Sequence, residues 1–503
     1  MKKTALQYNG SCDLKRFPVM IKTGAPLFGR RSDLKSGVFG SMAAVHNKPG
    51  GTRDMTKGPI LKQLLLFSLP LLFGNIFQMM YNTVDSIVVG NFVGTEALAA
   101  VGSTTMIINM LVFFFNGFSV GAGVVIGQRF GAKEEDKLHT AVQTTMALTF
   151  CFCVLFTIIG VSYVKPMLHL MSTPEDVFDD ASLYLKIYFS GIAGLLIYNM
   201  GSGILRAVGN TVLPLMFLVL TSLMNIVLDL FFVLGLHMAI DGVAYATILS
   251  QFISAMLVLV LLTRTKEIYR MTWSDLRIDR AVSGRIFAVA LPAGIQSVIT
   301  AFSNIFVQGY INYFGAECMA GWSCYNKLDQ MVFLVTQSIA MASTTFVSQN
   351  IGAKNEERAD RGTFTAISLA VATILVTGSI LVFNARPAVQ LFTQDEGVIA
   401  FGVMFIQTNT LFVLFNGVNH VLAGALRGRG DSRGPMVIML MGFVVLRQIY
   451  LFVLTRFISN TPRPVGFSYP VGWMLTMVME VCYFLYIRRR RKALEAADTG
   501  AED

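Results

Sequence analysis

Apolar residues along this chain fall in runs of about 20, and short segments rich in charged and turn-forming residues separate the runs. A helix of about 20 apolar residues crosses the hydrocarbon core of a bilayer, so each run is typical of a transmembrane span. We predict about twelve spans. Their approximate centres are Gln78, Met110, Leu148, Leu195, Leu220, Ser250, Ala301, Phe333, Leu369, Leu411, Phe443 and Met477. The pattern therefore predicts an all-α polytopic membrane protein.

The second half of the chain repeats short motifs of the first. Residues 128–133 (QRFGAK) match 349–354 (QNIGAK), 205–214 match 426–435, and 94–96 match 315–317, all at an offset of 221 positions. A fourth match, 68–70 with 290–292, lies one position off that register. We infer two homologous six-helix bundles that insert in the same direction, are related by an axis along the membrane normal, and enclose the substrate route between them.

The repeat and the composition suggest domain boundaries. We expect bundles at 55–265 and 286–490, joined by a basic linker at 266–285 and followed by a tail at 491–503. Residues 1–54 are rich in Gly, Ser, Lys and Arg, which favours disorder. An alternative is that translation begins at Met55, because MTKGPILKQLL leads directly into the first span; the sequence leaves both open.

The charge distribution indicates a membrane protein and not a partner of nucleic acid. Only 14% of residues are charged against 54% hydrophobic, and the net charge is +10. The basic residues gather in alternate loops, at 264–285, 427–433 and 488–492, whereas the intervening loops carry acids. By the positive-inside rule we expect a multi-pass protein of the plasma (inner) membrane with both termini in the cytoplasm.

Two acidic residues lie well inside predicted spans. Asp85 and Asp229 would each cost roughly 2.5–3.5 kcal/mol at the centre of a membrane helix, so such residues usually mark function. Counted inwards at 1.5 Å per residue, Asp85, Asp229 and Thr247 lie about 9–10 Å below the outer boundary. Tyr81 and Asn225 precede the two acids by four residues and share their helix faces. By contrast, Glu96, Glu317 and Asp329 are expected near span ends.

This set of five residues predicts a cation site. Two acids close together in a low dielectric cannot both ionise cheaply, so the pair titrates as a unit and can bind a proton. The same oxygen ligands suit a dehydrated Na⁺, and the sequence does not choose between the ions. Pairing with a buried base is the structural alternative, but the first half has no Lys or Arg at that depth. Pro70, inside the first span, is either a fixed kink or a hinge.

The second half does not repeat the acids. The positions that match Asp85 and Asp229 are about Phe306 or Val307 and about Tyr450. Arg447 either balances charge near the cavity or reaches an aqueous crevice. Glu480 lies about two turns from the arginine tail, where it could reach the interface or pair.

No pattern of an enzyme is present in the sequence. It has no Walker loop, metal cluster or nucleophilic triad, so we expect no catalytic residue, no cofactor and no metal other than Na⁺ at the predicted cation site. The 27 Met and 39 Phe would suit a pliable cavity for flat apolar ligands.

Together these features resemble the multidrug and toxic compound extrusion (MATE) family over residues 56–492, in particular its DinF-like branch. The repeat pairs QRFGAK/QNIGAK and LRAVGNTVLP/LRGRGDSRGP carry the resemblance. That branch places a proline, tyrosine and aspartate on the first helix, which match Pro70, Tyr81 and Asp85. Its remaining site residues match Asn225, Asp229 and Thr247. The NorM-like branch has acids on the seventh and tenth helices, and this chain lacks both.

The resemblance implies a V-shaped pair of six-helix bundles that exports organic cations or other amphipathic drugs in exchange for H⁺ or Na⁺. An alternative is a flippase for a lipid-linked precursor, which would favour cationic residues facing the cavity; Arg447 is the candidate the sequence offers. A membrane-embedded enzyme or receptor would need a larger extramembrane domain. Expected partners are small amphipathic or cationic substrates and the lipid bilayer, with no nucleic acid and no obligate protein partner.

Overall fold

The structure, a computed structural model, describes residues 51–171 and 173–499, and the regular elements within them are all helices. Among these residues, eleven helices are long and apolar enough to cross a membrane, and a bent pair makes a twelfth span. The prediction of an all-α protein with about twelve spans is therefore confirmed. The prediction of a disordered or non-native extension covers residues 1–54, of which residues 1–50 lie outside the described part.

The helices of the first half follow one another with short connections. They are α2 (Ile60–Val88), the π-helical turn η1 (Val89–Val93), α3 (Thr95–Gly131), α4 (Glu135–Leu170), α5 (Glu175–Ser190), α6 (Ile192–Ala207), α7 (Val212–Leu230), the π-helical turn η2 (Phe231–Gly235) and α8 (Ile240–Arg264). Helices α5 and α6 are the bent pair, at 48°. The bend falls at Gly191, where a side chain would meet Ile248 at 2.5 Å.

The second half has the same order of long helices with more interruptions. Its elements are η3 (Trp273–Asp275), α9 (Arg280–Asn312), α10 (Ala316–Gly352), α11 (Glu356–Phe383), α12 (Ala385–Gln390), α13 (Glu396–Asn409), η4 (Thr410–Phe412), α14 (Val413–Gly428), α15 (Arg433–Leu440), η5 (Met441–Leu446), α16 (Arg447–Val453), η6 (Leu454–Ile458), α17 (Pro462–Gly466) and α18 (Ser468–Thr499). The π-helical turns here are η5 and η6.

Backbone geometry repeats with the sequence. Gly209 and Gly430 have φ angles of 89° and 91°, and Lys133 and Lys354 have 57° and 56°. Both pairs are 221 positions apart and follow helix ends. A positive φ is unusual for lysine, so its recurrence shows that the two helix–helix turns are built alike.

A π-helical turn coincides with the one-residue change in repeat register. The offset between the copies is 222 at Pro70 and Pro292 but 221 at Gly94 and Gly315. The extra residue of the first copy lies between Pro70 and Gly94, where η1 widens the end of α2, whereas α9 continues without such a turn. A π-helical turn is the usual way for a helix to accommodate one inserted residue.

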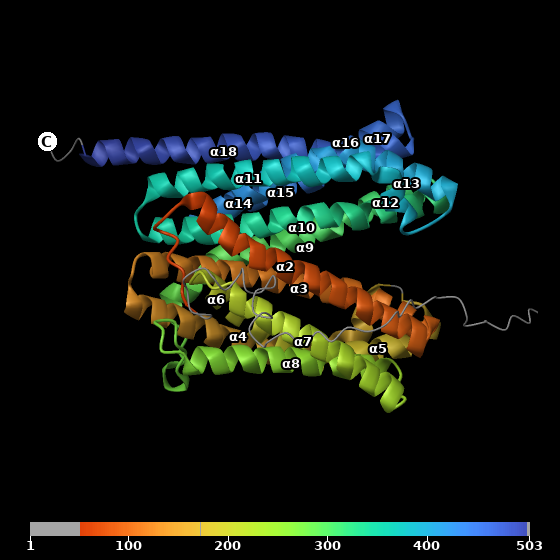
Figure 1. Ribbon diagram of the computed structural model, residues 1–503, viewed down its shortest axis with the longest axis horizontal. Helices are drawn as coiled ribbons and strands as arrows, with labels where there is room; N and C mark the ends of the chain where they lie inside the picture. The colour runs from red at the N-terminus through yellow and green to blue at the C-terminus, as the bar shows by residue number, and fades with distance from the viewer. Residues whose placement is uncertain (1–50, 172, 500–503) are drawn as a thin grey trace, which may run out of the picture. The chain divides into compact units, whose positions relative to one another are not determined.

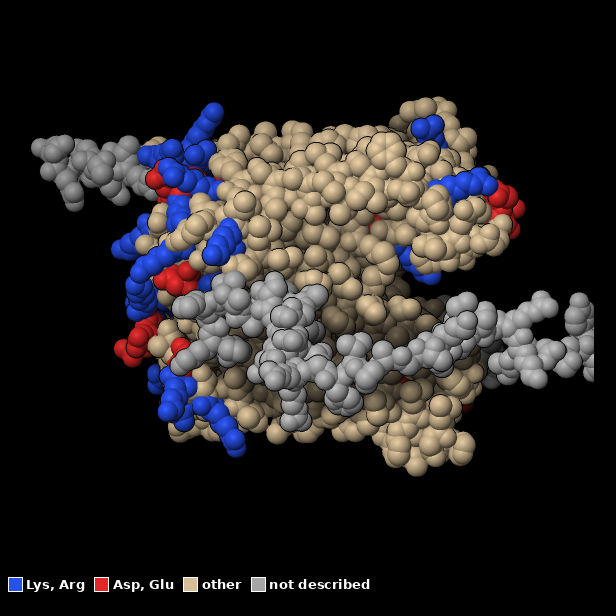
Figure 2. Space-filling view, viewed as in Figure 1, with Lys and Arg blue, Asp and Glu red and all other residues tan. Residues whose placement is uncertain are grey.

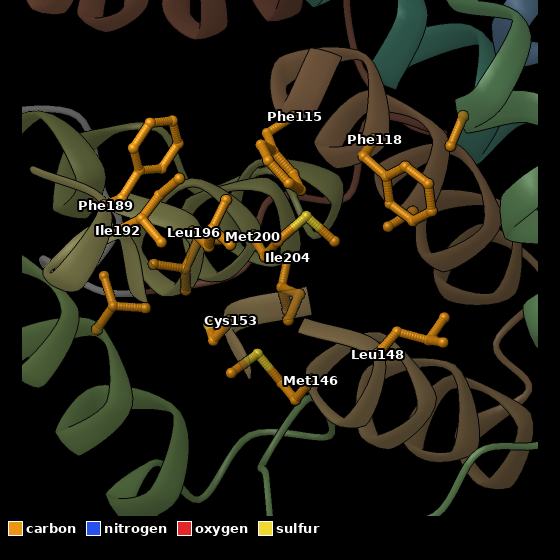
Figure 3. Close-up of a cluster of buried hydrophobic side chains, with 14 of the residues drawn as sticks. Phe115, Phe118, Met146, Leu148, Cys153, Phe189, Ile192, Leu196, Met200 and Ile204 are labelled. Atoms are coloured by element: carbon orange, nitrogen blue, oxygen red, sulfur yellow. The ribbon is translucent and has the colours of Figure 1, made fainter. Parts of the chain in front are cut away.

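Each half has an apolar core of its own. In the first half, Phe115 and Phe118 of α3 pack with Met146 and Cys153 of α4, and Met200 lies on α6 within the same cluster (Figure 3). A separate cluster in the second half joins α10, α13, α16 and α17, and Trp322 is fully buried within it. These cores hold the helices of each bundle in place around the space between the bundles.

Helix α2 connects the two bundles. Its beginning packs on the second half, where Leu64 and Phe67 join a cluster with Ile339 and Phe346 of α10. Its later part lies against α7 of the first half, and Figure 1 shows it crossing from one set of helices to the other. The helix that carries Asp85 therefore contacts both bundles.

Charged residues gather at one end of the helices, called the basic end below. There α3 turns into α4, α10 turns into α11, and α18 finishes; Figure 2 shows Lys and Arg concentrated at this left-hand end. Asp360 accepts hydrogen bonds from Arg429 and from Arg488, the latter at 2.8 Å, and Glu356 pairs with Arg491. Two arginines of the basic tail thus tie α18 to α11.

Two equivalent hydrogen bonds join the bundles near this end. Gln128 of α3 donates from Nε2 to the carbonyl oxygen of Gly428 at 3.0 Å, and Gln349 of α10 donates to that of Ala207 at 2.9 Å. Donors and acceptors are each 221 positions apart, so the repeat motif QRFGAK/QNIGAK supplies a symmetric contact. We call these two bonds the glutamine latch.

Candidate ion and substrate site

A cavity of about 550 Å³ lies between the two bundles. Helices α2, α3 and α5–α8 of the first half line it together with α9, α10 and α14 of the second. The surface is hollowed between the two sets of helices at the end opposite the basic end (Figure 2). This volume is in the range of small-molecule binding sites.

The predicted cation-site residues come together at the wall of this cavity. Tyr81, Asp85, Asn225 and Thr247 line it. Asp229 is completely buried behind them and its carboxyl group interacts with that of Asp85. Helices α2 and α7 thus place the two acids next to each other.

Several polar atoms of this cluster have no hydrogen bond to any described residue by geometric criteria. Both carboxyl oxygens of Asp229, Oδ1 of Asp85, both amide atoms of Asn225 and Oγ1 of Thr247 are buried without a hydrogen bond. Nearly all buried polar atoms in proteins are hydrogen-bonded, so a group of unpaired ones needs an explanation. Oxygen donors arranged in this way could accept a proton or hold a dehydrated cation such as Na⁺.

Two tyrosines that the sequence reasoning missed complete the site. Tyr184 and Tyr188 are one turn apart on α5 and line the cavity, with ring centroids 6.4 Å apart. Tyr184 lies next to Asp85, Asp229 and Thr247. The spacing of four residues between two aromatic phenols inside a span was the available signal.

Pro70 lines the same cavity from the middle of α2, which runs as one helix from Ile60 to Val88. Its ring removes one backbone hydrogen bond from a helix that contacts both bundles. The backbone hydrogen bond that Pro70 cannot donate therefore lies about four turns before Asp85.

Comparison with known proteins decides the family. A family model described as MatE matches residues 70–231 and again 292–453, once in each half. The chain belongs to the MATE family. Its members are multidrug efflux transporters and not enzymes. The double match also agrees with the internal repeat.

Curated relatives in the MATE family align with nearly the whole chain. The probable multidrug resistance protein YpnP of Bacillus subtilis (strain 168) is 28% identical over 440 residues, which cover 86% of this chain and 97% of that protein. The multidrug export protein MepA of Staphylococcus aureus (strain bovine RF122 / ET3-1) is 19% identical, with 88% and 97% covered.

Solved MATE structures share the fold. An outward-facing conformation of a multidrug resistance MATE family transporter aligns with a TM-score of 0.80 at 22% identity, covering 88% of this chain and 98% of that one. A MOP superfamily transporter from Pyrococcus furiosus, described by the reverse polarity of its binding pocket, aligns with a TM-score of 0.81, also at 22% identity, covering 89% and 100%.

The second half of this MATE protein places several residues differently from expectation. Arg447 lies inside the second bundle, not at the cavity: it donates to Ser303 Oγ at 2.7 Å and Asn304 Oδ1 at 2.9 Å, and its guanidinium stacks on Tyr469. Asp329, expected near a span end, lies about 20 Å along α10 beside Tyr325. The prediction that Asp329 lies near the end of its span is therefore wrong. The reason is that α10 begins earlier in the sequence than hydropathy alone indicates.

Two further expectations about charged residues were wrong. Glu480 neither reaches the interface nor forms an ion pair with any described residue; it is 0% exposed and both its carboxyl oxygens lack a hydrogen bond. Arg427, assigned to a loop, lies in the last turn of α14 and lines the cavity, as does Arg206 at the equivalent end of α6.

The lining of the MATE cavity also differs from the expected Met- and Phe-rich surface. Met341 is the Met that lines it and no Phe does, among the residues the structure describes. Amide side chains and tyrosines prevail instead: Asn75, Gln78, Asn109, Asn116, Asn199, Gln251, Gln337, Tyr81, Tyr184, Tyr188 and Tyr198. The phenylalanines are used in the bundle cores, where Phe115, Phe118 and Phe346 are fully buried.

Proposed function

We propose that this protein is a secondary active antiporter that exports organic cations or other amphipathic compounds across the plasma membrane in exchange for H⁺ or Na⁺. The observation that carries the proposal is that Asp85 lines the cavity next to the fully buried Asp229, and that neither acid forms an ion pair with a described residue. The relatives named as multidrug resistance and multidrug export proteins support the direction of transport.

The coupling ion would act on α2. An uncompensated pair of carboxylates in a low dielectric repels, and a bound proton or cation removes that repulsion. Because Asp85 is on α2 and Asp229 on α7, the loaded state draws these helices together and the empty state lets them separate. Helix α2 also packs on α10, so this local change biases the packing of the two bundles, with Pro70 at the crossing.

The orientation follows from the same charge pattern. With the basic end in the cytoplasm by the positive-inside rule, both termini are cytoplasmic and the cavity in this structure opens outwards. An outward-open cavity with an ion site in its wall is the state in which an exporter would release substrate and take up the coupling ion.

Transport by purified protein in proteoliposomes tests the proposal. The ethyl ester of rhodamine B, a permanent cation, is the probe, and a pH gradient or a Na⁺ gradient is imposed separately. We expect one of the gradients to drive dye movement, and Asp85→Asn or Asp229→Asn to reduce the driven rate at least tenfold, because a neutral amide cannot exchange the ion.

Asp136→Asn is the matched control, since this exposed acid lies in the first turn of α4 at the basic end. Helix content by circular dichroism checks that each variant is folded. Wild-type coupling in folded Asp85→Asn protein, or no response of wild-type protein to either gradient, would contradict the proposal.

A further inference from the structure

Two arginines at equivalent repeat positions line the cavity near the basic end. Arg206 ends α6 and Arg427 ends α14, 221 positions apart in the motif LRAVGNTVLP/LRGRGDSRGP. Thr344 of α10 lines the cavity with both of them and also borders a small space next to Arg206. The pseudo-symmetry of the two bundles thus brings two guanidinium groups to the same end of one cavity. We call this pair the arginine floor.

Neutral groups hold both arginines. Arg206 donates to Ser119 Oγ at 3.2 Å, and Arg427 donates to Gln296 Oε1 at 2.9 Å. Neither arginine forms an ion pair within the described ranges, and Nε of Arg427 is buried without a hydrogen bond. A guanidinium has five N–H donors in a planar fork suited to carboxylate or phosphate, so most of this donor capacity is unused.

The surrounding charges do not neutralise the floor. Glu480 is the acid that interacts with Arg427, from within the second bundle, and it makes no ion pair there. Asp85 lines the cavity too, but it belongs to the cation site with Asp229. His420 lies in the lining beside Arg427 and adds no negative charge. Two cations against one buried acid leave an excess of positive charge at this end.

The cavity is therefore polar along its length. Acids of the cation site occupy one region of its wall, the arginine floor another, and amide side chains such as Asn109, Asn116 and Asn199 line the space between. Such a lining can solvate both positive and negative groups of a ligand. Two guanidinium groups that form no ion pair with a described residue would repel a purely cationic drug.

We propose that the arginine floor is an anion-binding subsite, and that this transporter accepts amphipathic compounds carrying a carboxylate or phosphate group, including zwitterions. The anionic group is bound by Arg206 and Arg427 together, while any cationic part of the same molecule lies toward the tyrosine-lined region. The anion subsite defines the substrate class of the proposed exporter. Transport of these compounds rests on the proposed function, whereas their binding does not, because binding needs no ion gradient.

Equilibrium binding to protein in nanodiscs tests the proposal with two matched dyes. Rhodamine B carries a free carboxylate, and its ethyl ester has the same ring system without that charge. Fluorescence anisotropy should show that wild-type protein binds rhodamine B more tightly than the ester. We expect Arg206→Gln/Arg427→Gln to weaken rhodamine B binding at least tenfold and to change ester binding less than twofold.

Arg129→Gln is the control, because Arg129 lies at the basic end outside the cavity and pairs with Glu134 at 2.5 Å. It should change neither affinity. Equal affinities of the wild-type protein for the two dyes would overturn the proposal. An equal loss of affinity for both dyes in the double variant would also overturn the proposal, because that result is expected if the two arginines only stabilise the fold.

Competition distinguishes the source of the anion. Displacement of rhodamine B by inorganic phosphate indicates a subsite open to free anions, and displacement by dihexanoyl phosphatidic acid alone indicates a lipid headgroup; either supports an anion subsite. If neither compound displaces rhodamine B, the proposed anion subsite is contradicted. Because these measurements use no gradient, they remain informative even if the ion-coupled transport proposed above is not found.

Discussion

At the scale of single residues, two glycines permit the closest approach of the bundles. A Cβ atom at Gly131 would collide with the backbone carbonyl of Gln349, and one at Gly352 would collide with that of Gln128. Both glycines close their helices in the repeated motif, beside the glutamine latch. The contact is backbone against backbone, so no side-chain rotation can relieve a collision.

Gly131→Ala should therefore destabilise the conformation closed at the basic end. Overpacking of this kind costs roughly 1–3 kcal/mol. We expect a lower unfolding temperature of the purified protein and greater reactivity of a cysteine introduced at Ser348, which is buried against Gly127 of the other bundle, measured with a membrane-impermeant maleimide in a cysteine-free background.

Gly102→Ala on the same helix is the control. No heavy atom of the described residues lies within 4 Å of a Cβ at Gly102, so alanine there should stabilise α3 by about 0.5–1 kcal/mol. If Gly131→Ala behaved like Gly102→Ala, the bundles would not be held together at this point.

The residues of the candidate cation site could be proposed from the sequence because depth follows from helix rise, whereas the arginine floor could not. Asp85 and Asp229 stood out as acids inside apolar runs. Arg206 and Arg427 lie where an apolar run meets a turn, and hydropathy assigns such residues to loops. Only packing shows that the ends of α6 and α14 face the cavity.

At the scale of elements, each acid precedes a π-helical turn. Asp85 is followed by η1 (Val89–Val93) and Asp229 by η2 (Phe231–Gly235), and the two turns contact one another. Such turns are frequent at functional sites because they change the direction of nearby side chains within an otherwise regular helix. The one-residue register difference from α9 falls in η1, and α9 lacks this turn. By contrast, η6 (Leu454–Ile458) follows Tyr450, the position equivalent to Asp229, so the second π-helical turn is present in both halves.

Deletion of Asn91, an exposed residue of η1, tests this. Removing one residue from η1 lets this segment continue as a regular α-helix, as α9 does, so the side chains of η1 lose the direction that the π-helical turn gives them. We expect unchanged helix content but at least a tenfold loss of ion-driven dye transport, because η1 no longer fits against α3 and α8.

Deletion of Lys266, exposed in the linker between the halves, is the matched control and should leave transport near wild type. Full transport after deletion of Asn91 would show that η1 merely absorbs an extra residue. In the sequence, the signal of η1 was the one-residue shift in the register of the repeat. Hydropathy does not distinguish α-helical from π-helical turns, so the shift could not be assigned to a π-helical turn.

At the scale of the whole chain, the repeat predicted two six-helix bundles, and both the family match in each half and the helix count agree with this. What the repeat could not show is how the halves meet. The polar contacts between them use glutamine side chains and backbone carbonyls, and such contacts have no signature in composition or hydropathy.

The glutamine latch closes the basic end and should control which end is open. Each bond contributes about 1 kcal/mol net, so losing both should shift the ratio of the two conformations roughly 30-fold. In Gln128→Ala/Gln349→Ala protein, spin labels at Asp136 and Glu357, exposed and equivalent in the repeat, should give a broader distance distribution by electron–electron dipolar spectroscopy, with a longer mean than in the wild type.

The single variants Gln128→Ala and Gln349→Ala distinguish the effect of the latch bonds from that of a neighbouring hydrogen bond. Gln349 also accepts a hydrogen bond from the backbone N–H of Met55 at 2.9 Å, which ties the segment before α2 to the second bundle; Gln128 has no such bond within the described residues. Gln349→Ala should therefore open the basic end more than Gln128→Ala does. Equal distance distributions in both variants and the wild type would show that the glycine contacts alone hold the end closed. The latch would then be a consequence of closure and not one of its causes.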